Sequence, residues 1–496
     1  MSNYILAIDQ GTSSTKTIIF NAQGQVLAKG SVPLKTLYLP GGFVEQEPEA
    51  IWQNVLDSVK ECLSEFTKAG YNINDIKTCG ISNQRETFVV WDEAGRPLHN
   101  AVVWQCKRSV EVCQRLKTVD GLEAEINQRT GLIIDPYFSG TKLIWLNENN
   151  DKVKQAIANG KAYFGNVDTW LLYKMTGGAQ YLTDHTNASR TLFFNLQTLQ
   201  WDEVLLEKFG LGKLNLPELR SSAAAYGESD FNGLFNSPIT ITAMIGDSHA
   251  AAFGEGCFTP GTAKATLGTG CSMLMNIGGE AKASGNGMVT TICWSTGDRV
   301  DYALEGVIVS CGATIEWLRT EMGLFDDSKQ TEAIATSVPD NNGVYLVPAF
   351  SGLGAPHWDM SRKAEIVGLT FDCNKKHIIR AALETIPYQI KDVVTAMESD
   401  TGIALQELMV NGGITSNRFV LQFIADLTGS KLVNRGIADV SALGAALLAG
   451  LKAGIFENIE ALQSLMTNQL ELSPGEQQPQ TEQWYAGWQK AIAKQI

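Results

Sequence analysis

The sequence has no surplus of positive charge. It contains 39 lysines and arginines against 53 aspartates and glutamates, which gives a formal net charge of −14 over 496 residues. Proteins that bind nucleic acid or anionic membranes need positive charge to displace counterions, so this balance argues against both kinds of partner. A small anionic ligand stays compatible with it, because a few backbone N–H groups can bind a phosphate on an acidic protein.

Paired cysteines, an export signal and long hydrophobic runs are also missing. The nine cysteines stand singly with no C-x-x-C pair, which is typical of reduced thiols in a cytosolic protein. No basic segment followed by an apolar one opens the chain. The apolar stretch 442–449 is too short to span a bilayer, and Lys452 soon follows it. We therefore expect a cytoplasmic protein without membrane insertion.

Common nucleotide and metal motifs are absent too. The chain contains no G-x-x-x-x-G-K-[ST] phosphate loop, and no G-x-G-x-x-G follows its first predicted strand. Its five histidines are scattered without an H-x-x-x-H pair. These absences argue against a Walker-type nucleotide site, a Rossmann dinucleotide site and a zinc site.

Glycine is what the chain has in excess. Its 47 glycines make up about 9.5% of the residues, against a usual ~7%, which indicates many tight turns. A length of 496 residues predicts roughly three domains of ordinary size or two large ones.

One supersecondary unit occurs twice along the chain. Residues 4–28 are typical of a strand, a polar turn, a second strand, another turn and a third strand. Residues 262–275 again have the pattern of a strand, a Gly/Thr turn and a strand. We interpret this as a weak internal repeat and place a boundary near residue 253, which gives two halves, 1–252 and 253–496.

Hydrophobic periodicity predicts the other main elements. Apolar runs predict buried strands at 76–82, 88–91 and 239–245. Helical spacing predicts helices at 49–68, 107–117, 170–175, 418–427 and 442–451, the last with Ser441 as a possible N-cap. Strands combined with helices in this order indicate an α/β fold with mixed sheets.

The first candidate site is the turn 9–16, DQGTSSTK. Small residues in a tight turn let backbone N–H groups converge on a phosphate, and Lys16 adds positive charge. Asp9, at the end of an apolar strand, could hold Mg²⁺. The alternative is an ordinary polar hairpin with a lysine that faces solvent.

Two further glycine turns fall in the second half. Gly268-Thr269-Gly270 could complete a phosphate clamp, or its glycines could merely permit positive φ angles. The segment 410–417, VNGGITSN, ends a strand and opens a helix. Its backbone could approach an adenine or a phosphate with Asn417 as an amide partner, or it could be a plain helix-start turn.

Five side chains in the first half suggest chemistry on a polyol. Asp247 follows a buried strand and could act as a general base in phosphoryl transfer, or it could be a helix N-cap. Arg85 and Glu86 offer donors and acceptors suited to vicinal hydroxyls, or they form a surface ion pair. Trp104 and Tyr137 could wall such a pocket, or they are core aromatics.

Ordered motifs along almost the whole chain resemble the FGGY family of carbohydrate kinases. They are DQGT at 9–12, ISNQRET at 81–87, VWQC at 103–106, DPYFSGTK at 135–142, VDTW at 167–170, TNASR at 186–190, VPAFSGLGAP at 347–356, HIIRAA at 377–382 and YAGW at 485–488. The resemblance implies an α/β fold of two actin-like (ribonuclease-H-like) domains, with mixed sheets flanked by helices and the active site in the interdomain cleft. It also implies Mg²⁺-dependent transfer of the γ-phosphoryl group of ATP to a polyol hydroxyl.

The resemblance assigns roles residue by residue. Domain 1–252 would bind the acceptor and carry the first phosphate turn, and domain 253–496 would bind the nucleotide. Asp247 would be the catalytic base and Asp9 would lie near Mg²⁺. The acceptor contacts would be Arg85, Glu86, Trp104, Tyr137, Asp247 and Ser248. The nucleotide contacts would be Thr12, Ser13, Lys16, Thr269, Gly312, Gly413 and Asn417.

Two positions depart from the family members that phosphorylate glycerol. Those proteins usually carry Gln and Phe where this chain has Ser248 and Ser272, so the pocket here is expected to be roomier and more polar. The acceptor is therefore glycerol or, alternatively, a polyol or ketose of four or five carbons. An ATPase similar to actin or the heat-shock chaperones is the alternative from another class. For the assembly we consider a homodimer and a homotetramer.

Overall fold

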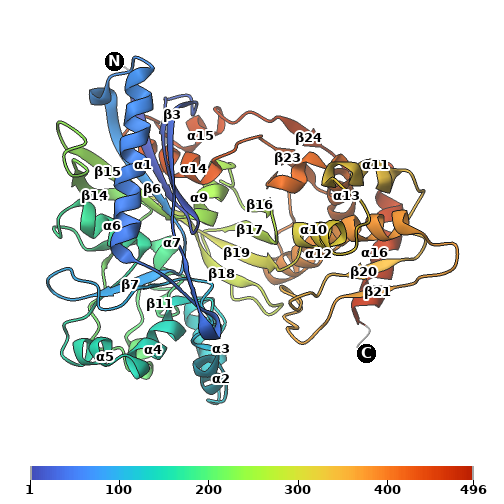
Figure 1. Cartoon of the computed structure of the whole chain (residues 1–496), viewed down its shortest axis with the longest axis horizontal. Coiled ribbons are helices and arrows are strands. Elements are labelled where there is room, and N and C mark those ends of the chain that lie inside the picture. The colour runs from blue at the N-terminus through green and yellow to red at the C-terminus, as the bar shows by residue number, and fades with distance from the viewer. Residues whose placement is uncertain (1–2, 494–496) are drawn as a thin grey trace.

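Two mixed β-sheets, one in each half of the chain, form the body of the protein (Figure 1). The computed structural model describes residues 3–493. The first sheet has the order β14 (Ala223–Ser229), β15 (Ile239–Gly246), β6 (Ile76–Asn83), β1 (Tyr4–Gln10), β2 (Ser14–Phe20), β3 (Val26–Pro33). The second has the order β18 (Val289–Ser295), β19 (Val300–Ile308), β17 (Cys271–Gly278), β16 (Thr262–Leu267), β22 (Glu407–Asn411), β23 (Lys431–Asn434), β24 (Leu470–Leu472).

The predicted repeat of the strand–turn–strand unit is confirmed by the topology. In the first sheet β1 pairs antiparallel with β2 and β2 with β3, while β6 and β15 continue parallel to β1. In the second, β16 pairs antiparallel with β17 and β17 with β19, while β22 and β23 continue parallel to β16. Each Gly/Ser/Thr turn therefore lies at the centre of its sheet, where residues from other strands can join it.

Smaller sheets extend both halves. A five-stranded sheet has the order β4 (Leu37–Leu39), β5 (Phe43–Gln46), β8 (Ala101–Val102), β7 (Phe88–Trp91), β9 (Tyr163–Asn166). Two-stranded sheets pair β10 (Leu182–Asp184) with β13 (Glu218–Arg220), β11 (Phe194–Asn195) with β12 (Gln200–Trp201), and β20 (Tyr345–Val347) with β21 (Glu365–Val367).

Helices flank the sheets. Those of the first half are α1 (Pro48–Lys68), α2 (Val110–Lys117), α3 (Leu122–Thr130), α4 (Ser139–Asn149), α5 (Asp151–Ala158), α6 (Val167–Met175), α7 (His185–Ala188), α8 (Glu203–Lys208) and α9 (Asp247–Gly254). The others are α10 (Gly312–Thr320), α11 (Thr331–Thr336), α12 (Lys375–Thr401), α13 (Arg418–Thr428), α14 (Val440–Lys452), α15 (Ile459–Gln463) and α16 (Gln478–Ala493). Among the helices of residues 3–493, none combines the length and the apolar character needed to cross a bilayer.

The predicted elements are present with shifted ends. The strand at 88–91 has the predicted bounds, whereas the helix expected from 107 begins at Val110 and the one expected from 170 begins at Val167. The N-cap prediction for Ser441 is wrong, because α14 begins at Val440 and Asp439 precedes it. The prediction of unpaired thiols is confirmed, since all nine cysteines are free, and eight of them are buried.

Helices α9 and α14 cross where the two halves meet (Figure 1). Although α14 belongs to the second half, it packs on β6, β1 and β15 of the first sheet, and one hydrophobic core joins it to both sheets. Glycines allow the crossing, because a Cβ on Gly444 would lie 1.8 Å from the carbonyl oxygen of Ala250, and one on Gly254 would lie 2.4 Å from that of Val440. The predicted boundary after residue 252 falls inside α9.

Candidate active site

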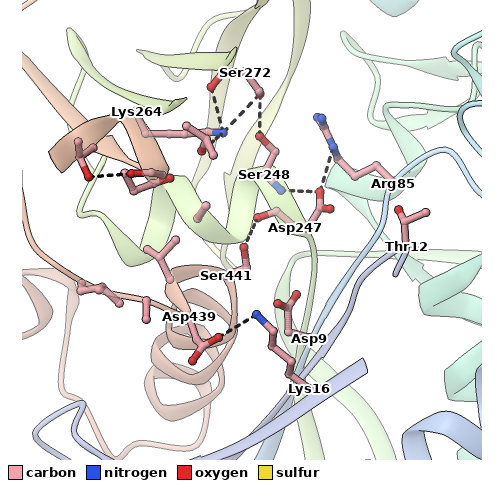
Figure 2. A pocket seen from close by; sticks show the side chains of 18 of the residues that line it. Asp9, Thr12, Lys16, Arg85, Asp247, Ser248, Lys264, Ser272, Asp439 and Ser441 are labelled. Atoms are coloured by element: carbon pink, nitrogen blue, oxygen red, sulfur yellow. Dashed lines mark hydrogen bonds and ion pairs between the residues drawn. The ribbon is translucent and has the colours of Figure 1, made fainter. Parts of the chain in front are cut away.

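A cavity of about 750 Å³ opens between the two sheets, and both halves of the chain line it (Figure 2). The turn after β1 enters it from one side, and the N-terminal ends of α9 and α14 enter it from another. Most of the residues predicted for the site lie on its wall: Asp9, Thr12, Lys16, Arg85, Glu86, Trp104, Tyr137, Asp247 and Ser248.

The β1–β2 turn places Asp9 and Lys16 side by side as partners in the strand register. Lys16 does not simply face solvent, since its Nζ lies 3.0 Å from Oδ1 of Asp439, which precedes α14 in the other half of the chain. Lys29 contacts the second oxygen of the same carboxylate, at 2.6 Å. The phosphate-binding turn predicted from the sequence is therefore joined to the opposite side of the cavity by an ion pair.

Asp9 has the properties of a ligand for a divalent cation. Burial and the nearby charge of Asp247 raise its pKa to about 6, although Ser82 donates a hydrogen bond to Oδ1 at 3.0 Å and Lys16 lies close by. A carboxylate destabilised in this way gains from a bound cation, and Mg²⁺ is commonly held by one or two carboxylates together with phosphate oxygens. Asp9 therefore fits one carboxylate ligand of Mg²⁺, with phosphate oxygens and water as the others, since residues 3–493 contain no group of three or more His, Cys, Asp or Glu side chains that could hold a metal ion.

Asp247 lies at the start of α9, with its carboxylate directed into the cavity (Figure 2). Gly246 occupies the N-cap position, so the alternative interpretation of Asp247 as the N-cap is wrong. Its Oδ1 accepts a hydrogen bond from the N–H of Ser248 at 2.6 Å and lies 3.4 Å from Nε of Arg85. Burial raises the pKa of Asp247, and the charge of Arg85 opposes that rise. An oriented carboxylate with a raised pKa is suited to accept a proton.

Arg85 and Glu86 are buried and belong to a chain of alternating charges, so the surface ion pair is excluded. Arg85 donates to Oε1 of Glu305 at 2.8 Å, Arg190 lies 2.8 Å from the other oxygen of Glu305, and Arg190 donates to Glu86 at 2.6 Å. Burial raises the pKa of Glu305, but the two arginines outweigh it and hold that pKa well below its usual range. Glu86 has a φ of 58°, a strained conformation for a non-glycine residue.

Trp104 and Tyr137 meet edge to face on the cavity wall, with ring centroids 5.6 Å apart. The indole Nε1 of Trp104 donates to Oγ1 of Thr12 at 2.9 Å, which ties the aromatic wall to the first turn. Lys142, fully buried, donates to the carbonyl oxygens of Pro136 and Tyr137 at 2.8 and 2.6 Å. The wall is therefore held in place from both sides.

Comparison with known proteins identifies this arrangement. The profile of the N-terminal domain of the FGGY family of carbohydrate kinases matches residues 4–254, and that of the C-terminal domain matches residues 263–453. The chain belongs to the FGGY family. It is therefore a carbohydrate kinase with the two-domain, actin-like fold that the sequence motifs predicted, and the alternative of an actin-like or chaperone-like ATPase is wrong.

Relatives of this FGGY kinase match it over its full length. It is 44% identical over 495 residues to the glycerol kinase of Thermoanaerobacter sp. (strain X514), covering 100% of this chain and 99% of the relative. It is 45% identical over 493 residues to that of Shigella dysenteriae, covering 99% and 97%. A crystal structure of Plasmodium falciparum glycerol kinase with ADP superposes with a TM-score of 0.94 at 35% identity, covering 100% and 99%. A xylulose kinase from Lactobacillus acidophilus shares the fold at 21% identity, with a TM-score of 0.87 and 99% and 98% coverage.

The other predicted residues of the FGGY kinase lie outside the cavity lining. Ser13 is exposed, and its carbonyl oxygen accepts from Leu34 at 2.9 Å. Thr269 is exposed where the β16–β17 turn meets α10, and its carbonyl oxygen accepts from the N–H of Ala313 at 3.0 Å. In the same place the N–H of Gly312 donates to the carbonyl oxygen of Gly268 at 2.9 Å.

The third glycine turn contributes neighbours of the predicted residues. Gly412 and Thr415 line the cavity, whereas Gly413 and Asn417 do not. Asn417 is the N-cap of α13, and its Oδ1 accepts from the N–H of Val420 at 3.1 Å. The contact that Asn417 makes is therefore the one expected of a plain helix-start turn.

Four charged residues were not predicted for the site, and one of them is Asp439, the partner of Lys16. Arg190 and Glu305 complete the buried ion chain, and Lys264 lines the cavity from β16. Arg190 stands inside one of the family motifs, TNASR, and Lys264 interrupts an otherwise apolar and Thr-rich strand. Both features could have marked Arg190 and Lys264 as site candidates from the sequence. Glu305 lies within a strand, and no residue near it in the sequence indicates its arginine partners.

Proposed function

We propose that this FGGY kinase transfers the γ-phosphoryl group of ATP to a terminal hydroxyl of glycerol, giving glycerol 3-phosphate and ADP. The observation that carries the proposal is the position of Asp247, on the wall of one cavity with the buried pair of Arg85 and Glu86 and with the turn that carries Thr12. The names of the relatives and the ADP in the Plasmodium structure support the choice of acceptor and donor.

The acceptor end of the cavity suits a pair of neighbouring hydroxyls. N–H groups of Arg85 donate to the acceptor oxygens, and the carboxylate of Glu86 accepts from their hydroxyl protons. The edges and faces of Trp104 and Tyr137 pack against the carbon chain. Because Arg85 and Glu86 are held by Glu305 and Arg190, their positions are set before the acceptor binds.

Asp247 acts as the general base. Its carboxylate takes the proton of the terminal hydroxyl while the hydroxyl oxygen bonds to the γ-phosphorus of ATP. The bond between that phosphorus and the oxygen bridging to the β-phosphate breaks, and ADP leaves with the electron pair. Closure of the cleft around the acceptor excludes water and so limits ATP hydrolysis.

The donor lies between the glycine turns. Thr12, Ser13 and Lys16 contact its phosphates, and Thr269, Gly312, Gly413 and Asn417 contact the nucleotide. Lys16 must then exchange Asp439 for a phosphate oxygen. Asp9 would hold Mg²⁺, directly or through water, and the ion would supply positive charge to the phosphate oxygens.

The function is tested by measuring ADP release with and without polyol. We expect ADP formation from MgATP to rise at least about tenfold on addition of glycerol, with glycerol 3-phosphate as the product by mass spectrometry. Equal ADP release with and without any polyol would contradict the proposal. Magnesium removal by a chelator is expected to abolish the reaction, and excess Mg²⁺ to restore it.

If Asp247 is the base, its protonation sets the acid limb of the profile of kcat/KM against pH. Because burial raises its pKa above the ordinary value of 3.8, the base becomes protonated and inactive before ordinary aspartates do. We expect kcat/KM for the acceptor, measured at saturating Mg²⁺, to fall by about tenfold per pH unit on that limb. Enzyme held at the acid pH and assayed at neutral pH separates this loss from unfolding. A flat profile down to about pH 4 would contradict the assignment.

A second acceptor class is favoured by the two serines near the base. Oγ of Ser248 lies 3.2 Å from Oγ of Ser272, so this wall presents hydroxyls and no bulky side chain. We therefore propose a polyol or ketose of four or five carbons as the alternative acceptor.

A further inference from the structure

Lys264 is a buried ammonium group at the cavity wall with only uncharged hydrogen-bond partners. Lys264 as a whole is 1% exposed. Its Nζ donates to Oγ1 of Thr266 at 3.3 Å, to the carbonyl oxygen of Ser272 at 3.3 Å and to Oγ of Ser272 at 3.4 Å. All three distances lie beyond the usual range for an N–H···O bond. A buried lysine normally has a close carboxylate partner, whereas the three N–H groups of Lys264 make only these long contacts and can turn toward a closer ligand oxygen in the cavity.

Lys264, Ser272 and Ser248 form one continuous polar wall (Figure 2). Ser272 stands opposite Thr266 in the β16–β17 register, and its hydroxyl links Lys264 to Ser248. Ser248 follows Asp247 directly, so the wall begins beside the base. An acceptor whose terminal hydroxyl reaches Asp247 therefore has this wall next to the rest of its chain.

The charges around the cavity favour an uncharged ligand at this wall. The cations Arg85, Arg190 and Lys264 are matched by the carboxylates of Glu86, Glu305 and Asp247, and Lys16 is matched by Asp439, so the carboxylate of Asp9 stands in excess. An acceptor with its own carboxylate or phosphate would add to this excess of negative charge. Hydroxyl and carbonyl oxygens accept from an ammonium group without adding charge.

We propose that Lys264, Ser272 and Ser248 form a subsite for an additional oxygen of the acceptor, so that an uncharged polyol or ketose of four or five carbons is used more efficiently than glycerol. The proposal rests on the phosphoryl transfer proposed above and names its preferred substrate class. Lys264 donates to the additional hydroxyl or carbonyl oxygen, and the two serine hydroxyls accept from or donate to it. A hydrogen bond to a charged group contributes about tenfold or more in kcat/KM.

The substrate test compares acceptors at saturating MgATP. Glycerol, tetritols, pentitols and pentuloses are the uncharged probes, and glycerate is the anionic one. We expect at least one uncharged four- or five-carbon acceptor to exceed glycerol by about tenfold in kcat/KM. A preference for glycerol over every longer acceptor, or a preference for glycerate, would overturn the proposal.

Two variants test the residues. Lys264→Met removes the ammonium group. Ser272→Phe places a bulky side chain in the subsite and keeps the charge of Lys264. Each is expected to reduce kcat/KM for the longer acceptor by about tenfold more than for glycerol. An equal loss for all acceptors would show a merely structural role. Lys431→Met, which changes a half-exposed lysine on the same sheet, is the matched control, and thermal unfolding with ATP titration checks folding of each variant.

The outcomes separate this proposal from the proposed function. If glycerol alone is phosphorylated, the phosphoryl transfer stands and the subsite is wrong. If no polyol or ketose stimulates ADP release, both are wrong.

Discussion

Asp247→Asn is expected to reduce kcat by about 10²- to 10⁴-fold while the protein still binds ATP. The amide keeps the size of the carboxylate, and its oxygen can still accept from the N–H of Ser248 and from Arg85. What it loses is the ability to take the proton of the attacking hydroxyl. Steady-state kinetics with saturating acceptor and MgATP measure the loss, and ATP titration by protein fluorescence measures the retained binding.

The matched control is Asp57→Asn, which changes an exposed carboxylate on α1 that is not part of the cavity lining. It should behave as the wild type in both assays. If Asp247→Asn keeps more than about a tenth of the wild-type kcat, Asp247 is not the base. If it loses ATP binding as well, its main role lies in the arrangement of the nucleotide site.

Glu305→Gln is expected to destabilise the protein by about 3 kcal/mol or more, because it leaves Arg85 and Arg190 without the carboxylate they share. All three side chains are buried, so water cannot replace the lost charge. Since Arg85 also faces the acceptor site, KM for the acceptor should rise. Urea unfolding followed by circular dichroism measures the first effect, and acceptor titration measures the second.

Glu316→Gln is the control for that experiment. It removes a glutamate that pairs with Arg319 on the surface of α10, where such pairs contribute little. Equal unfolding midpoints for Glu305→Gln and the wild type would mean that the buried ion chain contributes nothing to stability. A lower midpoint with an unchanged KM would separate its structural role from its role in binding.

Local patterns predicted the parts of the site that are contiguous in sequence. The two hairpins follow from alternating residues on either side of small, polar turns, and β7 has its predicted bounds because aromatic and β-branched residues end abruptly at Asp92. The family motifs then placed Arg85, Trp104 and Tyr137 around one pocket, and the structure confirms that they line one cavity.

Pairings between distant segments could not be predicted in this way. Lys16 meets Asp439 across 423 positions, and Arg85 meets Glu305 across 220. Lys264 alternates with buried alanines on β16, a pattern that normally marks the solvent face of a strand. The face of β16 that carries Lys264 points toward the cavity only because the second half of the chain packs against the first half. Propensity acts over a few residues, whereas these contacts depend on how whole sheets are placed.

The glycine crossing of α9 and α14 has a mechanical consequence. At Gly254 and Gly444 the two helix backbones touch directly, so no side chains interlock at that point, whereas Phe253 and Leu443 pack in the common core beside it. The N-terminal end of one helix carries Asp247, and that of the other follows Asp439. A small scissor movement about Gly254 and Gly444 would therefore change the separation of the two carboxylates, so that the joint between the halves also sets the spacing of these two groups on the cavity wall.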